Sequence, residues 1–191
     1  MSRLAIRVVG VAAVIALLGV GSYAVAGGGS KNFSGSPMTG YEENPDLSTT
    51  GTGSFTARLS DDGSSIHYKL SYSGLEGTVT QSHVHFGKTA INAGISFWLC
   101  ETATNPSPSA STPTCPSPGG TVEGDITSAE VIGPAGQGIE AGNLAEILAA
   151  MRAGHAYANV HSSKYPGGEI RAQLDNGRGH GDHDNDNEDD D

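Results

Sequence analysis

The feature that most constrains this chain is a period-two alternation of apolar and polar residues, repeated in short runs. The clearest run is residues 66–72, where every second side chain is apolar: Ile66, Tyr68, Leu70 and Tyr72. Residues 52–60 alternate in the same way, and residues 61–64 between the two runs contain the turn-forming Gly63. Because successive side chains of a strand point to opposite faces, such runs predict half-buried β-strands. The two runs together predict a hairpin.

Seven or eight such runs follow one another along the chain, and only one segment has helical periodicity. Asn143 can cap this helix, Glu146 follows three residues later, and Gly154 is suited to end it. Its apolar stripe consists of Leu144, Ile147, Leu148 and Met151. We therefore predict an all-β fold, an antiparallel β-sandwich or Greek-key barrel of about seven to eight strands, with one short helix near the C-terminal end.

The first 26 residues have the three parts of a secretory signal peptide. Arg3 and Arg7 precede an apolar run over residues 8–20, and residues 24–26 form a small-x-small cleavage pattern. The alternative is an uncleaved membrane anchor, but the run is short of the roughly 20 residues that a spanning helix needs. We expect the domain to be exported, to the extracellular space or the cell envelope, with no membrane insertion after cleavage. Residues 27–32 are predicted to be a flexible lead and residues 33–174 the β-domain.

The formal net charge of −11 is concentrated at the C-terminal end. Residues 175–191 contain eight acidic residues and one arginine, a net charge of −7, and no apolar side chain. Such a composition cannot bury enough surface to order itself, so we predict a disordered acidic tail. Neither the tail nor the remaining chain is basic, which argues against nucleic acid as a partner.

The chain has two cysteines, Cys100 and Cys115, separated by a segment rich in proline and serine. In an exported protein this pair predicts a structural disulfide. A reactive thiol pair is the alternative, and it would require a helix or a Cys-x-x-Cys spacing that this segment does not have.

Three histidines form the strongest candidate site. At strand periodicity Val79, Gln81, His83 and His85 share one face, and His161 ends a second predicted strand, residues 156–161. If the two strands are neighbours, three imidazoles converge on one ion, and neutral imidazole suits copper or zinc. Candidates for partners that orient these ligands are Gln81, Asn159 and Glu169.

Two other classes of function compete with a metal site. In a non-catalytic interaction module, binding an extracellular protein or a surface polymer, the histidines would only hydrogen-bond within a polar patch. In an enzyme we would expect a nucleophile beside a strained turn, and the chain has no Gly-x-Ser-x-Gly motif. We therefore expect a non-enzymatic protein. His67 is expected to be a solvated surface histidine, and Trp98 to be a core residue.

Several motifs, in order, resemble the chordin-type (CHRD) domain family. They are residues 83–87 (HVHFG), 133–138 (GPAGQG), 147–154, 158–161 (ANVH) and 166–171 (PGGEIR). The resemblance spans about residues 33–174, with Ala172 where the family usually has glycine. It implies a secreted β-domain, of a kind that occurs in bacteria as a stand-alone exported form. By weaker analogy the His-x-His strand is similar to that of copper/zinc superoxide dismutase. The bridging histidine and zinc subsite of that enzyme are not found here, so this second alternative is disfavoured.

Overall fold

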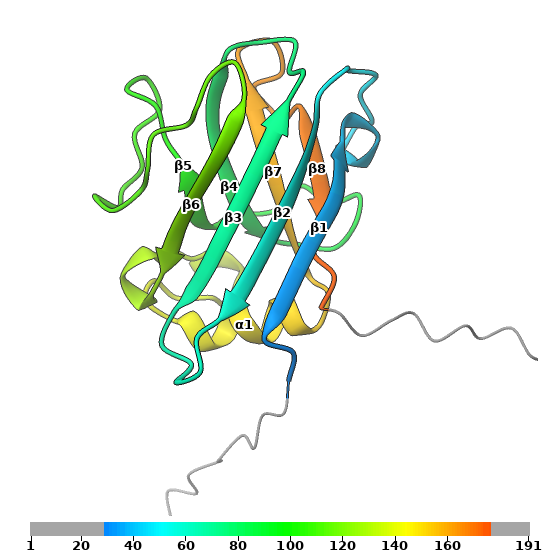
Figure 1. The fold of residues 1–191 in the computed structure, drawn as a ribbon. Coiled ribbons are helices and arrows are strands. Elements are labelled where there is room, and N and C mark those ends of the chain that lie inside the picture. The colour runs from blue at the N-terminus through cyan, green and yellow to red at the C-terminus, as the bar shows by residue number, and fades with distance from the viewer. Residues whose placement is uncertain (1–28, 177–191) are drawn as a thin grey trace, which may run out of the picture.

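Eight antiparallel strands form one sheet that curls into a nearly closed barrel in the computed structural model, which describes residues 29–176 (Figure 1). The strands are β1 (Asn32–Thr39), β2 (Thr52–Leu59), β3 (Ile66–Ser73), β4 (Val79–Phe86), β5 (Ile95–Cys100), β6 (Gly120–Ile126), β7 (Ala156–Ser162) and β8 (Ile170–Gln173). The helices are α1 (Leu144–Arg152) and three 3₁₀ turns, η1 (Gly40–Glu42), η2 (Ser128–Glu130) and η3 (Ala135–Gln137). The predicted all-β class with one helix near the C-terminal end is confirmed.

The predicted signal peptide lies outside the described residues, as do Gly27 and Gly28 of the predicted lead and residues 177–191 of the predicted acidic tail. Within residues 29–176, no helix combines the length and the apolar character needed to cross a membrane. Strand β1 begins at Asn32. Asp175 exchanges two backbone hydrogen bonds with Ser34, with N–O distances of 3.0 and 2.7 Å.

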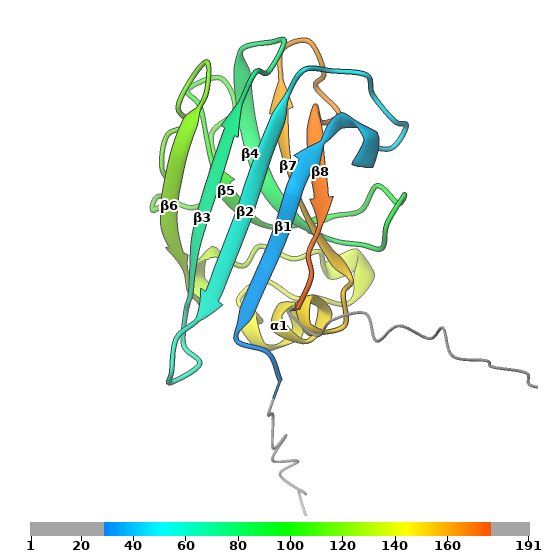
Figure 2. The ribbon, with the colours of Figure 1, turned by 45° about the vertical axis from the view of Figure 1, so that its right-hand side comes forward.

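The strand order β5-β4-β7-β8-β1-β2-β3-β6 brings segments distant in sequence together. Strands β5 and β6 are the two edges, and the sheet curls until they approach each other (Figure 2). The Tyr68 hydroxyl of β3 donates a 2.6 Å hydrogen bond to the backbone oxygen of Leu99 in β5, and so ties the two ends of the sheet. Inward side chains such as Phe55, Leu70 and Phe97 fill the interior.

Helix α1 covers one end of the barrel (Figures 1 and 2). The Asn143 side chain accepts a hydrogen bond from the backbone N–H of Glu146, as expected for an N-cap. The predicted apolar stripe, including Met151, is buried. Packing of this stripe against the barrel, which removes apolar surface from water, stabilises so short a helix more than its intrinsic propensity does.

The predicted alternation of β4 holds only after a β-bulge. Val79 is opposite Ser162 and Gln81 is opposite His161, so Thr80 is an extra residue relative to β7. The bulge reverses the parity of the strand: Val79 and Val84 both lie in the core, although they are an odd number of positions apart. The expectation that Val79 shares a face with His83 and His85 was therefore wrong. The two histidines lie on the face opposite the core.

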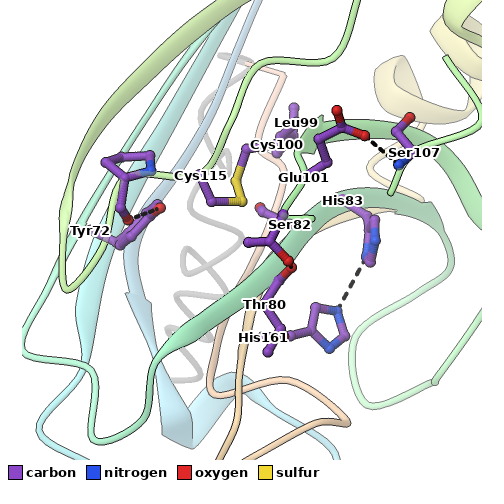
Figure 3. Close-up of a disulfide and its surroundings, with 12 residues drawn as sticks. Tyr72, Thr80, Ser82, His83, Leu99, Cys100, Glu101, Ser107, Cys115 and His161 are labelled. Atoms are coloured by element: carbon purple, nitrogen blue, oxygen red, sulfur yellow. Dashed lines mark hydrogen bonds between the residues drawn. A yellow bond between two sulfur atoms is a disulfide. The ribbon is translucent and has the colours of Figure 1, made fainter. Parts of the chain in front are cut away.

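The predicted disulfide joins Cys100, at the end of β5, to Cys115. Cys100 is paired in register with Ser82 of β4, which is the residue before His83 (Figure 3). The bond therefore closes the long loop between β5 and β6 beside the strand that carries two of the three candidate ligands.

Candidate metal centre

Strands β4 and β7 are antiparallel neighbours, and their register brings the predicted ligands together. His83 is opposite Asn159, His85 is opposite Tyr157, and Gln81 is opposite His161. Beyond the Thr80 bulge, the side chains of β4 alternate between the core and this outer face. The condition that the sequence analysis set, that the two histidine strands be neighbours, is thus met.

The ring nitrogens of the three histidines converge. One ligand atom from each of His83, His85 and His161 lies within 4.8 Å of the other two. His83 Nδ1 lies 3.2 Å from His161 Nε2, the contact drawn as a dashed line in Figure 3. Two ligands at 2.0–2.1 Å from a tetrahedral ion are roughly 3.3 Å apart. The histidine pair is therefore already at the separation that a shared ion requires.

Asn159 completes the cluster. Its side-chain oxygen lies 3.1 Å from His161 Nε2 and 3.2 Å from His85 Nε2. The sequence indicated Asn159 only as a residue that orients the ligands. Instead, its oxygen lies among the ligand nitrogens, at spacings similar to those between the nitrogens themselves.

Backbone carbonyl groups fix the proton positions on two of the rings. His85 Nδ1 lies 2.8 Å from the Ala93 oxygen, and His161 Nδ1 lies 2.9 Å from the Pro166 oxygen. Because a carbonyl oxygen only accepts hydrogen bonds, each Nδ1 must carry the proton. In a neutral ring the other nitrogen, Nε2, then presents a lone pair, and in both residues that lone pair faces the centre of the cluster.

All three imidazoles are buried and held neutral. Burial lowers the pKa of His83 to about 2 and that of His85 to about 4, because the charged form loses its hydration. Burial also lowers the pKa of His161. Neutral imidazole is the metal-binding form, so these rings need not lose a proton before they coordinate an ion.

Aromatic rings and a buried arginine enclose the cluster. Trp98 packs edge-on against His83, with centroids 4.3 Å apart, and Tyr157 stacks on His85 at 4.7 Å. The Arg171 guanidinium carbon lies 3.3 Å from the Tyr157 ring centroid. These rings exclude water from the imidazoles. Sequence reasoning missed this role for Trp98, which the apolar run of residues 94–100 suggested to be an ordinary core residue.

Arg171 also fastens the loop that covers the site. Its two terminal nitrogens donate hydrogen bonds to the backbone oxygens of Ile91 and Lys88, at 3.1 and 3.0 Å. The Ala93 N–H of the same loop donates to the Tyr157 hydroxyl at 3.1 Å. The loop over residues 87–94 is thereby fixed above His85 and supplies the Ala93 carbonyl that orients it.

The other predicted partners lie apart from the cluster. Glu169 is buried, but its Oε1 accepts hydrogen bonds from the Thr49 hydroxyl and the Glu76 N–H, at 2.7 and 2.6 Å. Gln81 is partly exposed, and among the described residues its side chain makes no hydrogen bond with the histidines. His67 is exposed, as expected, and pairs with Asp125.

Comparison with known proteins identifies the family to which this chain is similar. The family model described as CHRD domain matches residues 35–174, which covers every strand except the first residues of β1 and includes all three histidines. The searches of curated proteins and of solved structures gave no match.

Proposed function

The chain belongs to the CHRD domain family, and on that premise we propose that it is an exported, non-enzymatic module whose three histidines bind one copper or zinc ion. The observation that carries this proposal is the convergence of His83, His85 and His161 at ligand spacing. Export is supported by the signal-peptide pattern of residues 1–26 and by the disulfide, which is typical of proteins in oxidising compartments.

The lone pairs of the cluster favour a cation at its centre. The Nε2 atoms of His85 and His161 are acceptors, and the Asn159 oxygen that faces both is also an acceptor. Acceptors that face one another repel unless a proton or a metal ion lies between them. The donor set of three imidazoles and an oxygen suits Zn²⁺ and Cu²⁺, and it lacks the thiolate or thioether that Cu⁺ prefers.

A metal-free hydrogen-bond network is the alternative, and it belongs with the interaction-module hypothesis. If the Asn159 amide is turned so that its NH₂ group faces the rings, its two N–H bonds satisfy both Nε2 atoms. In that arrangement the histidines would stabilise the pairing of β4 with β7. Binding of an extracellular protein or polymer would then be the function.

A superoxide-dismutase-like enzyme is the weaker alternative. Within residues 29–176, His83, His85 and His161 form the one group of three or more side chains with metal-ligand geometry. Dismutase chemistry of the copper/zinc type requires a bridging histidine and a second subsite.

Calorimetric titration of the full chain with Cu²⁺ and with Zn²⁺ tests the proposal. The His83→Ala/His85→Ala variant should lose a one-to-one binding step that the unmodified protein shows. The matched control is His67→Ala/His155→Ala, which removes two imidazoles outside the cluster and leaves the step intact. All three proteins carry the same tail, so binding by its acids or by His180 and His183 cancels in the comparison. Identical heats in all three proteins would contradict the metal site and favour the interaction module.

A further inference from the structure

A cavity of about 340 Å³ is formed by three loops, one of which contains Pro166, whose carbonyl group orients His161. The loop after η1 contributes Glu43 and Asn44, the β4–β5 loop contributes Asn92, and the β7–β8 loop contributes Lys164 and Pro166. Figure 2 shows η1 beside the end of β8 where these loops meet. The volume lies within the range of small-molecule sites, roughly 300–1,000 Å³.

Glu43 places a buried carboxyl group in this cavity, and the metal centre does not explain it. The residue is 6 % exposed, and within residues 29–176 its Oε1 has no hydrogen-bond partner. A side chain at Gly168 would overlap this carboxyl group, so glycine leaves the space for it. Burial raises the pKa of Glu43 to about 7, against the opposing effect of the Arg171 charge. The carboxyl group thus offers one buried oxygen that is able to donate or accept a hydrogen bond near neutral pH.

The other polar groups of the cavity offer mainly acceptors. The Asn44 side-chain amide donates to the Ala90 oxygen, and that of Asn92 donates to the Asn44 oxygen, both at 2.9 Å. Among the described residues, no donor of the protein reaches the side-chain oxygens of these two asparagines. Both asparagines are exposed, so their oxygens are open to a ligand that brings hydrogen-bond donors.

The charges around the cavity are already paired. Lys164 forms an ion pair with Glu76, and both Arg171 terminal nitrogens bond to loop carbonyl groups. An anionic ligand would approach the carboxyl groups of Glu43 and Glu76, whose negative charge opposes it. A cationic ligand would approach both Lys164 and Arg171, whose charges repel it. The cavity favours a neutral ligand.

The remaining wall is apolar. Pro45, Leu47 and Pro166 line the cavity together with the partly buried ring of Tyr165. We propose that this cavity binds a neutral sugar unit, whose hydroxyl groups donate to Glu43 and the asparagine oxygens while its C–H face packs against the prolines and the tyrosine. The site is distinct from the metal centre and does not depend on metal binding.

Nuclear magnetic resonance titration of the full chain with single monosaccharides tests this proposal. The probes are glucose, galactose, mannose and N-acetylglucosamine, with glucosamine and glucuronate as charged counterparts. For a ring of about a dozen heavy atoms we expect a Kd on the order of 1 mM. At least one neutral sugar should shift the backbone amide signals of Asn44, Asn92 and Tyr165, and the charged rings should bind more weakly.

Two pairs of variants locate the binding. A Cβ at Gly167, which lines the cavity, and one at Gly136, which does not, would each meet no atom within 4 Å. Gly167→Leu should abolish the shifts, whereas Gly136→Leu adds the same bulk elsewhere and should retain them. At a pH above the Glu43 pKa, Glu43→Gln should weaken binding about tenfold, because a neutral amide oxygen then replaces a carboxylate that accepts a charge-assisted hydrogen bond, and the exposed neighbour substitution Glu42→Gln should not. Shifts that survive Gly167→Leu, tighter binding of a charged ring, or no shift with any sugar would each overturn the proposal.

Discussion

The indole ring of Trp98 meets the imidazole of His83 edge to face, with centroids 4.3 Å apart and an angle of 84° between the rings. Trp98 is the single tryptophan of the chain. Its indole N–H is buried without a hydrogen-bond partner among the described residues. The tryptophan fluorescence of the protein therefore originates at the wall of the candidate metal centre.

Copper binding at the cluster should quench this fluorescence strongly. A Cu²⁺ ion held by His83 would lie within a few ångströms of the indole, close enough for efficient energy or electron transfer from its excited state. Zn²⁺ has a filled d shell and no redox chemistry, so it should change the emission little while it competes with Cu²⁺ for the site. Fluorescence titration measures both effects.

The matched variants for this titration are His83→Ala and His67→Ala. The first should remove the quenching and the second should leave it unchanged, because His67 is an exposed residue of β3. Quenching of equal depth in the two variants would place the copper elsewhere and contradict the assignment of the cluster.

Asn159 should control metal affinity more than its neutral side chain suggests. Its oxygen lies 3.1 and 3.2 Å from two of the ligand nitrogens. Asn159→Ala should weaken binding by about 10- to 100-fold, the usual effect of removing a group that supports metal ligands. Asn159→Asp places a negative oxygen at the same position and should strengthen binding of a divalent ion. Competition with a chelator of known affinity measures both changes, and equal affinities in the three proteins would exclude Asn159 from the site.

The sequence was sufficient to predict which histidines cluster, but not the details of their surroundings. The alternation of side chains along a strand placed His83 and His85 on one face, and the predicted strand of residues 156–161 supplied His161. The Thr80 bulge was hidden, because only the register against β7 reveals an extra residue. Glu43 and Arg171 were also missed, since charged residues in loops and on outward strand positions are usually solvated. Loops bury both residues, and the packing of loops leaves no periodic pattern in the sequence.

The stability of the metal-free protein should fall as the pH decreases below about 6.5, the ordinary histidine pKa. The unfolded chain binds protons there, whereas native His83 and His85 remain neutral down to pH values of about 2 and 4. Each histidine therefore contributes a slope of up to about 1.4 kcal/mol per pH unit to the free energy of unfolding. His161 acts in the same direction.

Glu43 opposes this trend in part. Native Glu43 has a pKa of about 7 against 4.5 when unfolded, so its contribution to stability decreases as the pH rises from 4.5 to 7. Where both effects operate, the stability lost through the three histidines as the pH decreases exceeds the stability gained through the one carboxyl group. Urea unfolding in the presence of a chelator, from pH 7 to pH 5, should show a flatter dependence for His83→Gln/His85→Gln than for the unmodified protein. Parallel curves would contradict the burial of neutral rings.

Arg171→Lys should loosen the loop that covers the site without disrupting the barrel. Lysine keeps the charge near Glu43, but it cannot donate to the Ile91 and Lys88 oxygens in the forked geometry of the guanidinium group. Hydrogen exchange of the amides in residues 88–93 should become faster, and exchange in β2 and β3 should not change. A uniform increase across all strands would instead indicate global destabilisation.

The atoms that hold His85 and His161 in their tautomers are main-chain oxygens, those of Ala93 and Pro166. Every amino acid carries such an oxygen, so mutation of either residue leaves the acceptor itself in place. Relatives of this protein are therefore free to vary these two positions widely while the imidazoles stay oriented, provided that loop length and path are retained. We therefore expect relatives to show substitutions at these two positions but few insertions or deletions in the two loops.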